Sequence, residues 1–138
     1  MRQAMTTITI ETKGRGLVEI TREVSRVVAG AAIGSGLATL FCRHTSASLL
    51  IQENADPDVQ RDLEAFFARI APEGPGYVHD AEGPDDMPAH IRAALTATSL
   101  SIPVTGGRLA LGTWQGVYLF EHRRAPHRRE VVVQVMGE

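Results

Sequence analysis

Three histidines lie among acidic and small polar residues, where imidazole rings could share a metal ion. His44 interrupts a strand-like stretch, His79 lies in a loop, and His90 opens a predicted helix. Imidazole is the commonest side-chain ligand for zinc and similar ions, and three such ligands leave a fourth position for water or substrate. No HxxxH or HxH spacing supports a shared site. The spacing alone therefore favours the plainer interpretation, that each histidine is a polar loop or cap residue.

The loop between His79 and His90 is densely acidic. Its carboxylates are those of Asp80, Glu82, Asp85 and Asp86. Such groups could orient the histidine rings as hydrogen-bond acceptors, or hold magnesium directly. The plainer alternative is a solvated loop in which Asp85 or Asp86 caps the next helix.

A second group of unusual residues lies at the ends of one predicted strand, residues 113–121. Glycines, the chain's only tryptophan and Gln115 gather at its start, and such strands often line a ligand or another backbone. Gln115 and Glu121 share one face but lie about 20 Å apart on a regular strand. They could serve one site only if the strand bends, and separate sites if the protein oligomerises. Asn54 ends another strand without an evident structural role.

Basic residues flank the last turn of the chain, at positions 122–124 and 127–129. A charged hairpin tip is usually solvated surface. The alternative is an anchor for phosphate or for an anionic partner, because arginine forms strong paired hydrogen bonds with such groups.

Composition excludes several classes of protein. The chain has 138 residues, of which 43% are hydrophobic, and a formal net charge of −2, so it predicts one globular domain over residues 1–138 with no electrostatic bias toward nucleic acid. The single cysteine, Cys42, lies in an apolar run and is expected to be inert core. The first residues lack an apolar stretch, so no signal peptide is expected, and no membrane span is expected either. The sequence contains no phosphate-binding glycine loop and no GxSxG motif. A cytoplasmic location without membrane association is the expectation.

The elements that must position these residues follow from periodicity and turn signals. Thr21 is expected to cap a first helix, and Asp56-Pro57 to start a second. A third helix is expected over residues 89–98. Strands are predicted at residues 6–12, 17–20, 37–51 with a bend at 44–46, 99–104, 108–111, 113–121 and 130–135. This order predicts an α+β fold, with antiparallel, sandwich-like sheets and about three packed helices in a single domain.

Several motifs, taken in order, resemble the YjbQ-type secondary thiamine-phosphate synthase family. They are His44-Thr-Ser-Ala-Ser48, Gln52-Glu-Asn-Ala-Asp-Pro-Asp-Val59, Gly83-Pro-Asp-Asp-Met-Pro-Ala-His-Ile91, Ser99-Leu-Ser-Ile-Pro-Val104 and Leu109-Ala-Leu-Gly-Thr-Trp-Gln115. The match runs over nearly the whole chain. One small departure is Gln52, where an asparagine is often found.

The resemblance implies a homotrimer with polar pockets near subunit boundaries. It also implies a weak activity that joins a hydroxymethylpyrimidine diphosphate to a thiazole phosphate and releases pyrophosphate. Because His44, His79 and His90 fall on motif positions, it strengthens the hypothesis that they bind a divalent metal such as zinc.

We therefore expect a small phosphorylated heterocycle as substrate. Ser46, Asn54 and Gln115 are candidate substrate-binding residues, and Asp85 and Glu121 are candidate catalytic proton acceptors or ligand orienters. The alternatives are a metal- or metabolite-binding trimer without catalysis, and a protein whose three histidines are purely structural.

Overall fold

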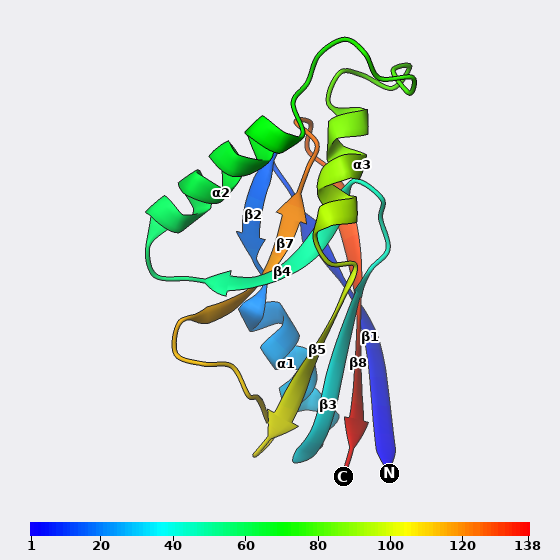
Figure 1. Cartoon of the computed structure of the whole chain (residues 1–138). Coiled ribbons are helices and arrows are strands. Elements are labelled where there is room, and N and C mark those ends of the chain that lie inside the picture. The colour runs from blue at the N-terminus through cyan, green and yellow to red at the C-terminus, as the bar shows by residue number, and fades with distance from the viewer.

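Two antiparallel sheets form the framework of the computed structural model, which describes residues 1–138 (Figure 1). The five-stranded sheet has the order β1 (Arg2–Glu11), β8 (Arg128–Gly137), β3 (Ser35–Cys42), β5 (Ser99–Thr105) and β6 (Arg108–Leu109). The three-stranded sheet has the order β2 (Gly16–Glu19), β7 (Gln115–Glu121) and β4 (Ala47–Glu53). The helices are α1 (Thr21–Ala31), α2 (Pro57–Ile70) and α3 (Asp86–Leu95). The predicted α+β class is confirmed.

The apolar core joins both sheets to α1. It is a cluster of 17 buried residues that includes Val24 on α1, Leu49 and Leu119 on the smaller sheet, and Leu40 and Val133 on the larger one. In Figure 1, α2 and α3 lie at one end of the molecule, and both termini lie at the other. The start of α3 lies at the first of these ends and carries Asp86 and His90.

The predicted bend in residues 37–51 is confirmed, and it moves the chain from one sheet to the other. β3 pairs with β5 and β8, whereas β4 pairs with β7. His44 and Ser46 lie in the crossing between β3 and β4, where the backbone leaves one ladder before it joins the next. Polar side chains are tolerated there because they are hydrogen-bonded: His44 accepts the Glu130 amide, and Ser46 accepts Arg129.

The helix starts are confirmed in one case and corrected in two. The Asp56 side chain accepts a hydrogen bond from the Asp58 amide at 2.9 Å, as an N-cap does. Thr21 is not a cap but the first helical residue, and its hydroxyl binds Glu19 and accepts the Val117 amide. The third helix runs from Asp86 to Leu95 instead of over residues 89–98, because Pro88 occupies its first turn and not the position before it.

The hairpin that joins β5 to β6 has the predicted geometry. Gly106 and Gly107 have φ angles of 58° and 74°, the positive values that a tight two-residue turn between antiparallel strands requires. No helix in the structure combines the length and the apolar character that a bilayer crossing needs.

Candidate metal centre

His79, Asp86 and His90 converge at the start of α3. The Nε2 atoms of His79 and His90 lie 2.7 Å and 3.0 Å from the same carboxylate oxygen, Asp86 Oδ2. Potential ligand atoms of the three residues all lie within 4.8 Å of one another. Asp86 and His90 are four residues apart on one helix, so their side chains lie on one face of α3.

The hydrogen bonds of His90 determine which of its nitrogens is free. Its Nδ1 donates to the carbonyl of Thr45 at 2.8 Å, so Nδ1 carries the proton and Nε2 of the neutral ring carries a lone pair. That lone pair points at a carboxylate oxygen that His79 Nε2 also approaches. A lone pair facing a carboxylate is stable only when a proton or a cation lies between them.

Asp86 is held in place by an arginine from the turn after β7. Arg123 Nη1 donates to Asp86 Oδ1 at 2.7 Å, which leaves Oδ2 directed at the imidazoles. Burial raises the pKa of Asp86, but the His79 hydrogen bond and the electrostatic effects of the neighbouring His90 and Arg123 outweigh it and lower the pKa. The hydrogen bond to Asp86 in turn raises the pKa of His79. The cluster is therefore an anionic carboxylate that faces two imidazoles.

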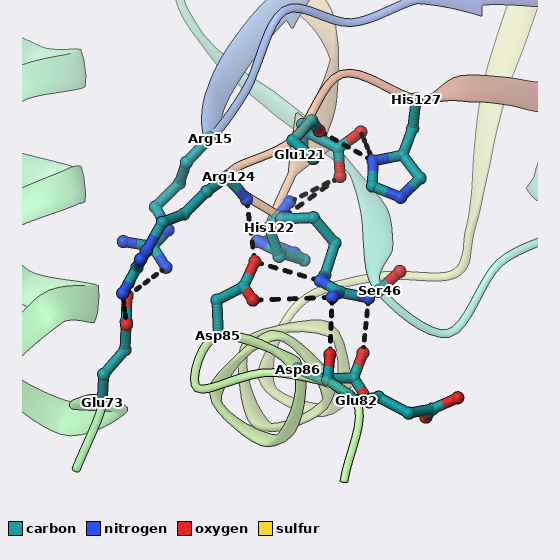
Figure 2. A network of polar contacts seen from close by, with 12 residues as sticks. Arg15, Ser46, Glu73, Glu82, Asp85, Asp86, Glu121, His122, Arg124 and His127 are labelled. Carbon is teal, nitrogen blue, oxygen red and sulfur yellow. Dashed lines mark hydrogen bonds and ion pairs between the residues drawn. The ribbon is translucent and has the colours of Figure 1, made fainter. Parts of the chain in front are cut away.

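Asp85 lies beside Asp86 but is not part of the histidine cluster. Figure 2 shows both carboxylates at the start of α3, facing the turn after β7. Asp85 accepts hydrogen bonds from Arg123 Nε at 3.0 Å and from the Arg124 amide at 2.9 Å. Burial raises the pKa of Asp85, and these bonds outweigh it and lower the pKa. The carboxylate thus joins the helix to the turn as an anion.

His44, the third predicted ligand, is not part of the cluster. Its Nε2 accepts the backbone amide of Glu130 at 2.7 Å, which occupies that lone pair. Burial lowers the pKa of His44, and the neighbouring positive charge of Arg129 lowers it further. The structure thus brings two of the three predicted histidines together, and it adds Asp86 to them.

Two adjoining pockets lie beside this centre. The first has a volume of about 570 Å³ and is lined by His44, Thr45, Ala47, Ser48, His90, Ala93, Ala94 and Thr98. The second has a volume of about 610 Å³ and is lined by Phe41, Cys42, Arg43, His44, Thr45, Ser46, Thr98 and Arg129. His44, Thr45 and Thr98 line both, so His44 faces the same space as His90 although it lies outside the cluster.

Glu121 lies beneath the second pocket in a buried ion pair. Arg129 Nε donates to Glu121 Oε1 at 2.8 Å, and the Thr12 hydroxyl donates to the same oxygen at 2.6 Å. Burial raises the pKa of Glu121, and the bonds from Arg129 and Thr12 reverse the effect and lower it. Ser46 contributes its Oγ as an acceptor for Arg129 Nη2 at 3.0 Å. Figure 2 shows Glu121 and Ser46 in this network.

A buried histidine next to Glu121 was not predicted as a site residue. The His122 ring is fully buried, with Nε2 2.8 Å from Ser48 Oγ. Thr96 Oγ1 continues the chain, 2.6 Å from Ser48 Oγ and 2.8 Å from the Arg92 carbonyl. Burial lowers the pKa of His122 to about 3, and the charge of Arg92 adds to the effect. The ring is therefore neutral in the folded protein.

Asn54 and Gln115 lie at the opposite end of β7 from Glu121. The backbone N–H of Asn54 donates to the Trp114 carbonyl at 3.0 Å, and the side-chain oxygen Oε1 of Gln115 accepts the backbone N–H of Gly112 at 2.8 Å. The strand runs without a break from Gln115 to Glu121, so Gln115 and Glu121 are about 20 Å apart. Within one chain, Asn54 and Gln115 are therefore not brought to the histidine cluster.

The role of Asp86 in the cluster depends on where α3 begins. A helix that starts at residue 89 leaves Asp86 in a loop, where nothing relates it to His90. A helix that starts at Asp86 gives the i, i+4 spacing that places both on one face. The proline at position 88 was the sequence signal for this earlier start, because proline favours the first turn.

Comparison with curated proteins finds relatives over almost the whole chain. A family model described as UPF0047 protein YjbQ-like matches residues 6–138. A UPF0047 protein of Synechocystis is 56% identical over 138 residues, which cover 99% of this chain and 94% of the relative. The UPF0047 protein YjbQ of Escherichia coli is 44% identical over 133 residues, with 96% of each chain covered.

Solved structures agree with these relatives. A crystal structure of a YjbQ/UPF0047 family protein from Clostridium acetobutylicum has a TM-score of 0.88 at 36% identity, covering 95% of this chain and 99% of that one. A YjbQ-like protein of unknown function from Sulfolobus solfataricus has the same fold, with a TM-score of 0.88 at 23% identity and coverage of 99% and 100%. The chain described here belongs to the UPF0047, YjbQ-like family.

Proposed function

We propose that the chain binds a divalent metal ion through His79 Nε2, Asp86 Oδ2 and His90 Nε2. The observation that carries this proposal is the approach of two imidazole nitrogens to one carboxylate oxygen, at 2.7 Å and 3.0 Å. Thr45 fixes the tautomer of His90 so that its lone pair faces that oxygen. A cation held between the three groups removes the repulsion without protonating either ring.

The donor set suits zinc or a similar transition ion better than magnesium. Two imidazoles and one carboxylate are typical ligands of such ions and leave one position for water or substrate, whereas magnesium prefers oxygen ligands. Arg123 orients the carboxylate and Thr45 orients one imidazole, which is the support that ligands of metal sites usually have.

For the reaction, we propose the weak thiamine-phosphate synthase activity that the sequence motifs imply. Pyrophosphate leaves the carbon of the pyrimidine diphosphate, and the ring nitrogen of the thiazole phosphate attacks that carbon. A divalent ion held by His79, Asp86 and His90 would supply positive charge for the leaving pyrophosphate. The two pockets, about 570 Å³ and 610 Å³, are of the size that small-molecule sites have, and their shared wall allows two rings to lie side by side.

In this reaction Asp85 and Glu121 act as positioning residues. Both carboxylates accept several hydrogen bonds from arginines and backbone amides, so each is held as an anion. Neither lines a pocket. This observation also favours the alternative function, a metal- or metabolite-binding protein without catalysis, because no carboxylate base reaches the pockets.

We further propose that the protein assembles as a homotrimer. The outer face of the five-stranded sheet exposes large apolar side chains, among them Met5, Leu37, Phe41 and Met136. Several large exposed apolar side chains on one face of a sheet are typical of a subunit interface. Phe41 also lines the second pocket, so a neighbouring subunit on this face would border it. Light scattering coupled to gel filtration tests the proposal: a mass of three chains is expected, and a monomer would contradict it.

Metal analysis of the purified wild type and of two variants tests the metal centre. We expect about one transition ion per chain in the wild type, and loss of that ion in Asp86→Asn and His90→Ala. His127→Ala is the matched control, because His127 is a half-buried histidine outside the cluster. Metal content that is unchanged in His90→Ala would refute the centre.

Turnover separates the two proposed functions. Product from the pyrimidine diphosphate and the thiazole phosphate should form with the metal-loaded wild type and fall in parallel with metal content in the variants. Metal binding at one ion per chain without any metal-dependent product would favour the non-catalytic alternative.

A further inference from the structure

Arg129 lines the second pocket with a guanidinium group that is almost completely buried. It is 4% exposed, and β8 places it between Glu121 and the crossing that carries His44 and Ser46. Its Nε and Nη2 atoms both donate to the carboxylate of Glu121, and Nη2 also donates to Ser46. These bonds fix the plane of the guanidinium group and the direction of its remaining nitrogen, Nη1.

Arg129 Nη1 has no acceptor. Its one polar neighbour is His44 Nδ1 at 3.4 Å. His44 Nε2 accepts the Glu130 amide at 2.7 Å, so the proton of the neutral ring is on Nδ1. Arg129 Nη1 and His44 Nδ1 are therefore two N–H donors side by side, and neither can satisfy the other.

The other arginines of the basic run differ from Arg129 in acceptors or in exposure. All three guanidinium nitrogens of Arg123 have acceptors. Arg124 and Arg128 are exposed, so solvent can satisfy any nitrogen that has no protein acceptor. Two adjacent donors on a buried cation, facing a pocket, are the arrangement that holds an oxyanion.

We propose that the second pocket contains an oxyanion subsite in which Arg129 Nη1 and His44 Nδ1 donate to two oxygens of a phosphate group. This inference rests on the proposed function for the identity of its occupant, the phosphate ester of the thiazole substrate. Glu121 neutralises the charge of Arg129, so the anion is held by directed hydrogen bonds, not by a net positive field. The shared wall of His44 and Thr45 places the subsite next to the pocket that His90 lines.

The subsite also gives a role to His44. In the structure this ring does not join the metal cluster, yet it faces both pockets. A donor on the wall between metal and anion would hold the phosphate of one substrate while the pyrophosphate of the other lies near the metal ligands.

Titration of the chelator-treated protein with inorganic phosphate, followed by proton–nitrogen NMR of the histidine side chains, tests the subsite directly. We expect saturable binding and a downfield shift of the His44 Nδ1–H signal, because that proton gains a charged acceptor. His44→Ala should weaken phosphate binding by about tenfold or more, since a charge-assisted hydrogen bond is lost. Arg129→Lys, which keeps the positive charge beside Glu121, should weaken it similarly.

Arg128→Lys is the matched control, because Arg128 is the neighbouring arginine on β8 and its side chain is 75% exposed. Its phosphate affinity should equal that of the wild type. Absence of saturable phosphate binding in the wild type would overturn the proposal, and so would equal affinity in His44→Ala. Acetate in place of phosphate reports on the occupant: binding as tight as that of phosphate would overturn a phosphate subsite.

The same titration in His79→Ala separates this proposal from the metal centre. Phosphate binding that persists in a variant without metal supports the subsite even if the proposed reaction is never observed. Metal binding in the wild type without phosphate binding would overturn the subsite alone.

Discussion

Replacing His122 by glutamine should remove much of the protein's sensitivity to mild acid. In the folded protein burial lowers the pKa of this histidine to about 3, from an ordinary value of 6.5. Between these two values the unfolded chain binds a proton that the folded chain does not bind. The contribution of His122 to the free energy of unfolding is therefore fully present above pH 6.5, and it falls as the pH falls below that value.

The size of the effect follows from the two pKa values. For one proton, each pH unit below 6.5 lowers the free energy of unfolding by about 1.36 kcal/mol. The loss at about pH 5 is therefore about 2 kcal/mol. This loss changes little if the folded pKa is a unit higher, because pH 5 lies well above it. A carboxylate with a lowered pKa, such as that of Glu121, reduces the free energy of unfolding only when the pH falls below its ordinary pKa of 4.5. It therefore adds little to the loss at pH 5.

Two other histidines titrate in this range. The lowered pKa of His44 acts in the same direction as that of His122, and the raised pKa of His79 acts in the opposite direction. Comparison of the wild type with His122→Gln removes both contributions, because they are present in each protein.

The assay is denaturant unfolding at about pH 7.5 and about pH 5, at one protein concentration and with chelator present. His122→Gln should lose about 2 kcal/mol less than the wild type between the two conditions. His127→Gln, the same change at a less buried histidine, should behave as the wild type does. An equal loss in the wild type and in His122→Gln would refute the reasoning, since the buried ring would then not be the group that resists protonation.

Three further predictions concern the packing and the ion pairs. Glu121→Gln leaves a buried arginine without its anion and should lower the free energy of unfolding by about 3–5 kcal/mol, measured by denaturant unfolding at neutral pH. Gly36→Ala should prevent folding or lower the melting temperature strongly, because the added Cβ would meet a backbone carbonyl of β8. Gly30→Ala is the control: a Cβ at this position on α1 would meet no atom within 4 Å, so the change should be neutral or stabilising by up to about 1 kcal/mol. Arg123→Lys should weaken metal binding about 10–100-fold, because Asp86 loses a hydrogen bond that orients it; a chelator competition titration measures this, and unchanged affinity would contradict the role.

The sequence predicts the elements of this fold better than it predicts their arrangement. Alternation and turn residues identify the strands, and Asp56-Pro57 identifies the start of α2, because these signals are local. The division of strands into two sheets is not local: β3 and β4 are adjacent in sequence but pair with different partners. Nothing in their residue pattern specifies those partners.

The candidate site was predictable only in part, because some of its contacts depend on strand pairing that the local sequence does not specify. The motif positions identified His79 and His90, which do meet, but they also grouped His44 with them. The crossing between β3 and β4 directs His44 to the Glu130 amide, a contact that depends on β8, far away in the chain. Glu121 was predicted as a site residue, but the burial of its partner Arg129 was hidden, because Arg129 looks like surface in a basic segment until Glu121 is known to face it.

The basic segment after β7, residues 122–129, connects the two halves of the proposed site. Arg123 holds Asp86 toward the imidazoles, and Arg129, after the turn, holds its free donor toward the second pocket. Both are positioned by carboxylates that do not line a pocket, Asp85 for the first and Glu121 for the second. Because one short turn joins the two arginines, metal ligands and anion donors are set relative to each other by backbone geometry. This arrangement explains why Arg129 is buried against Glu121 at an electrostatic cost that the exposed arginines of the same segment, Arg124 and Arg128, avoid.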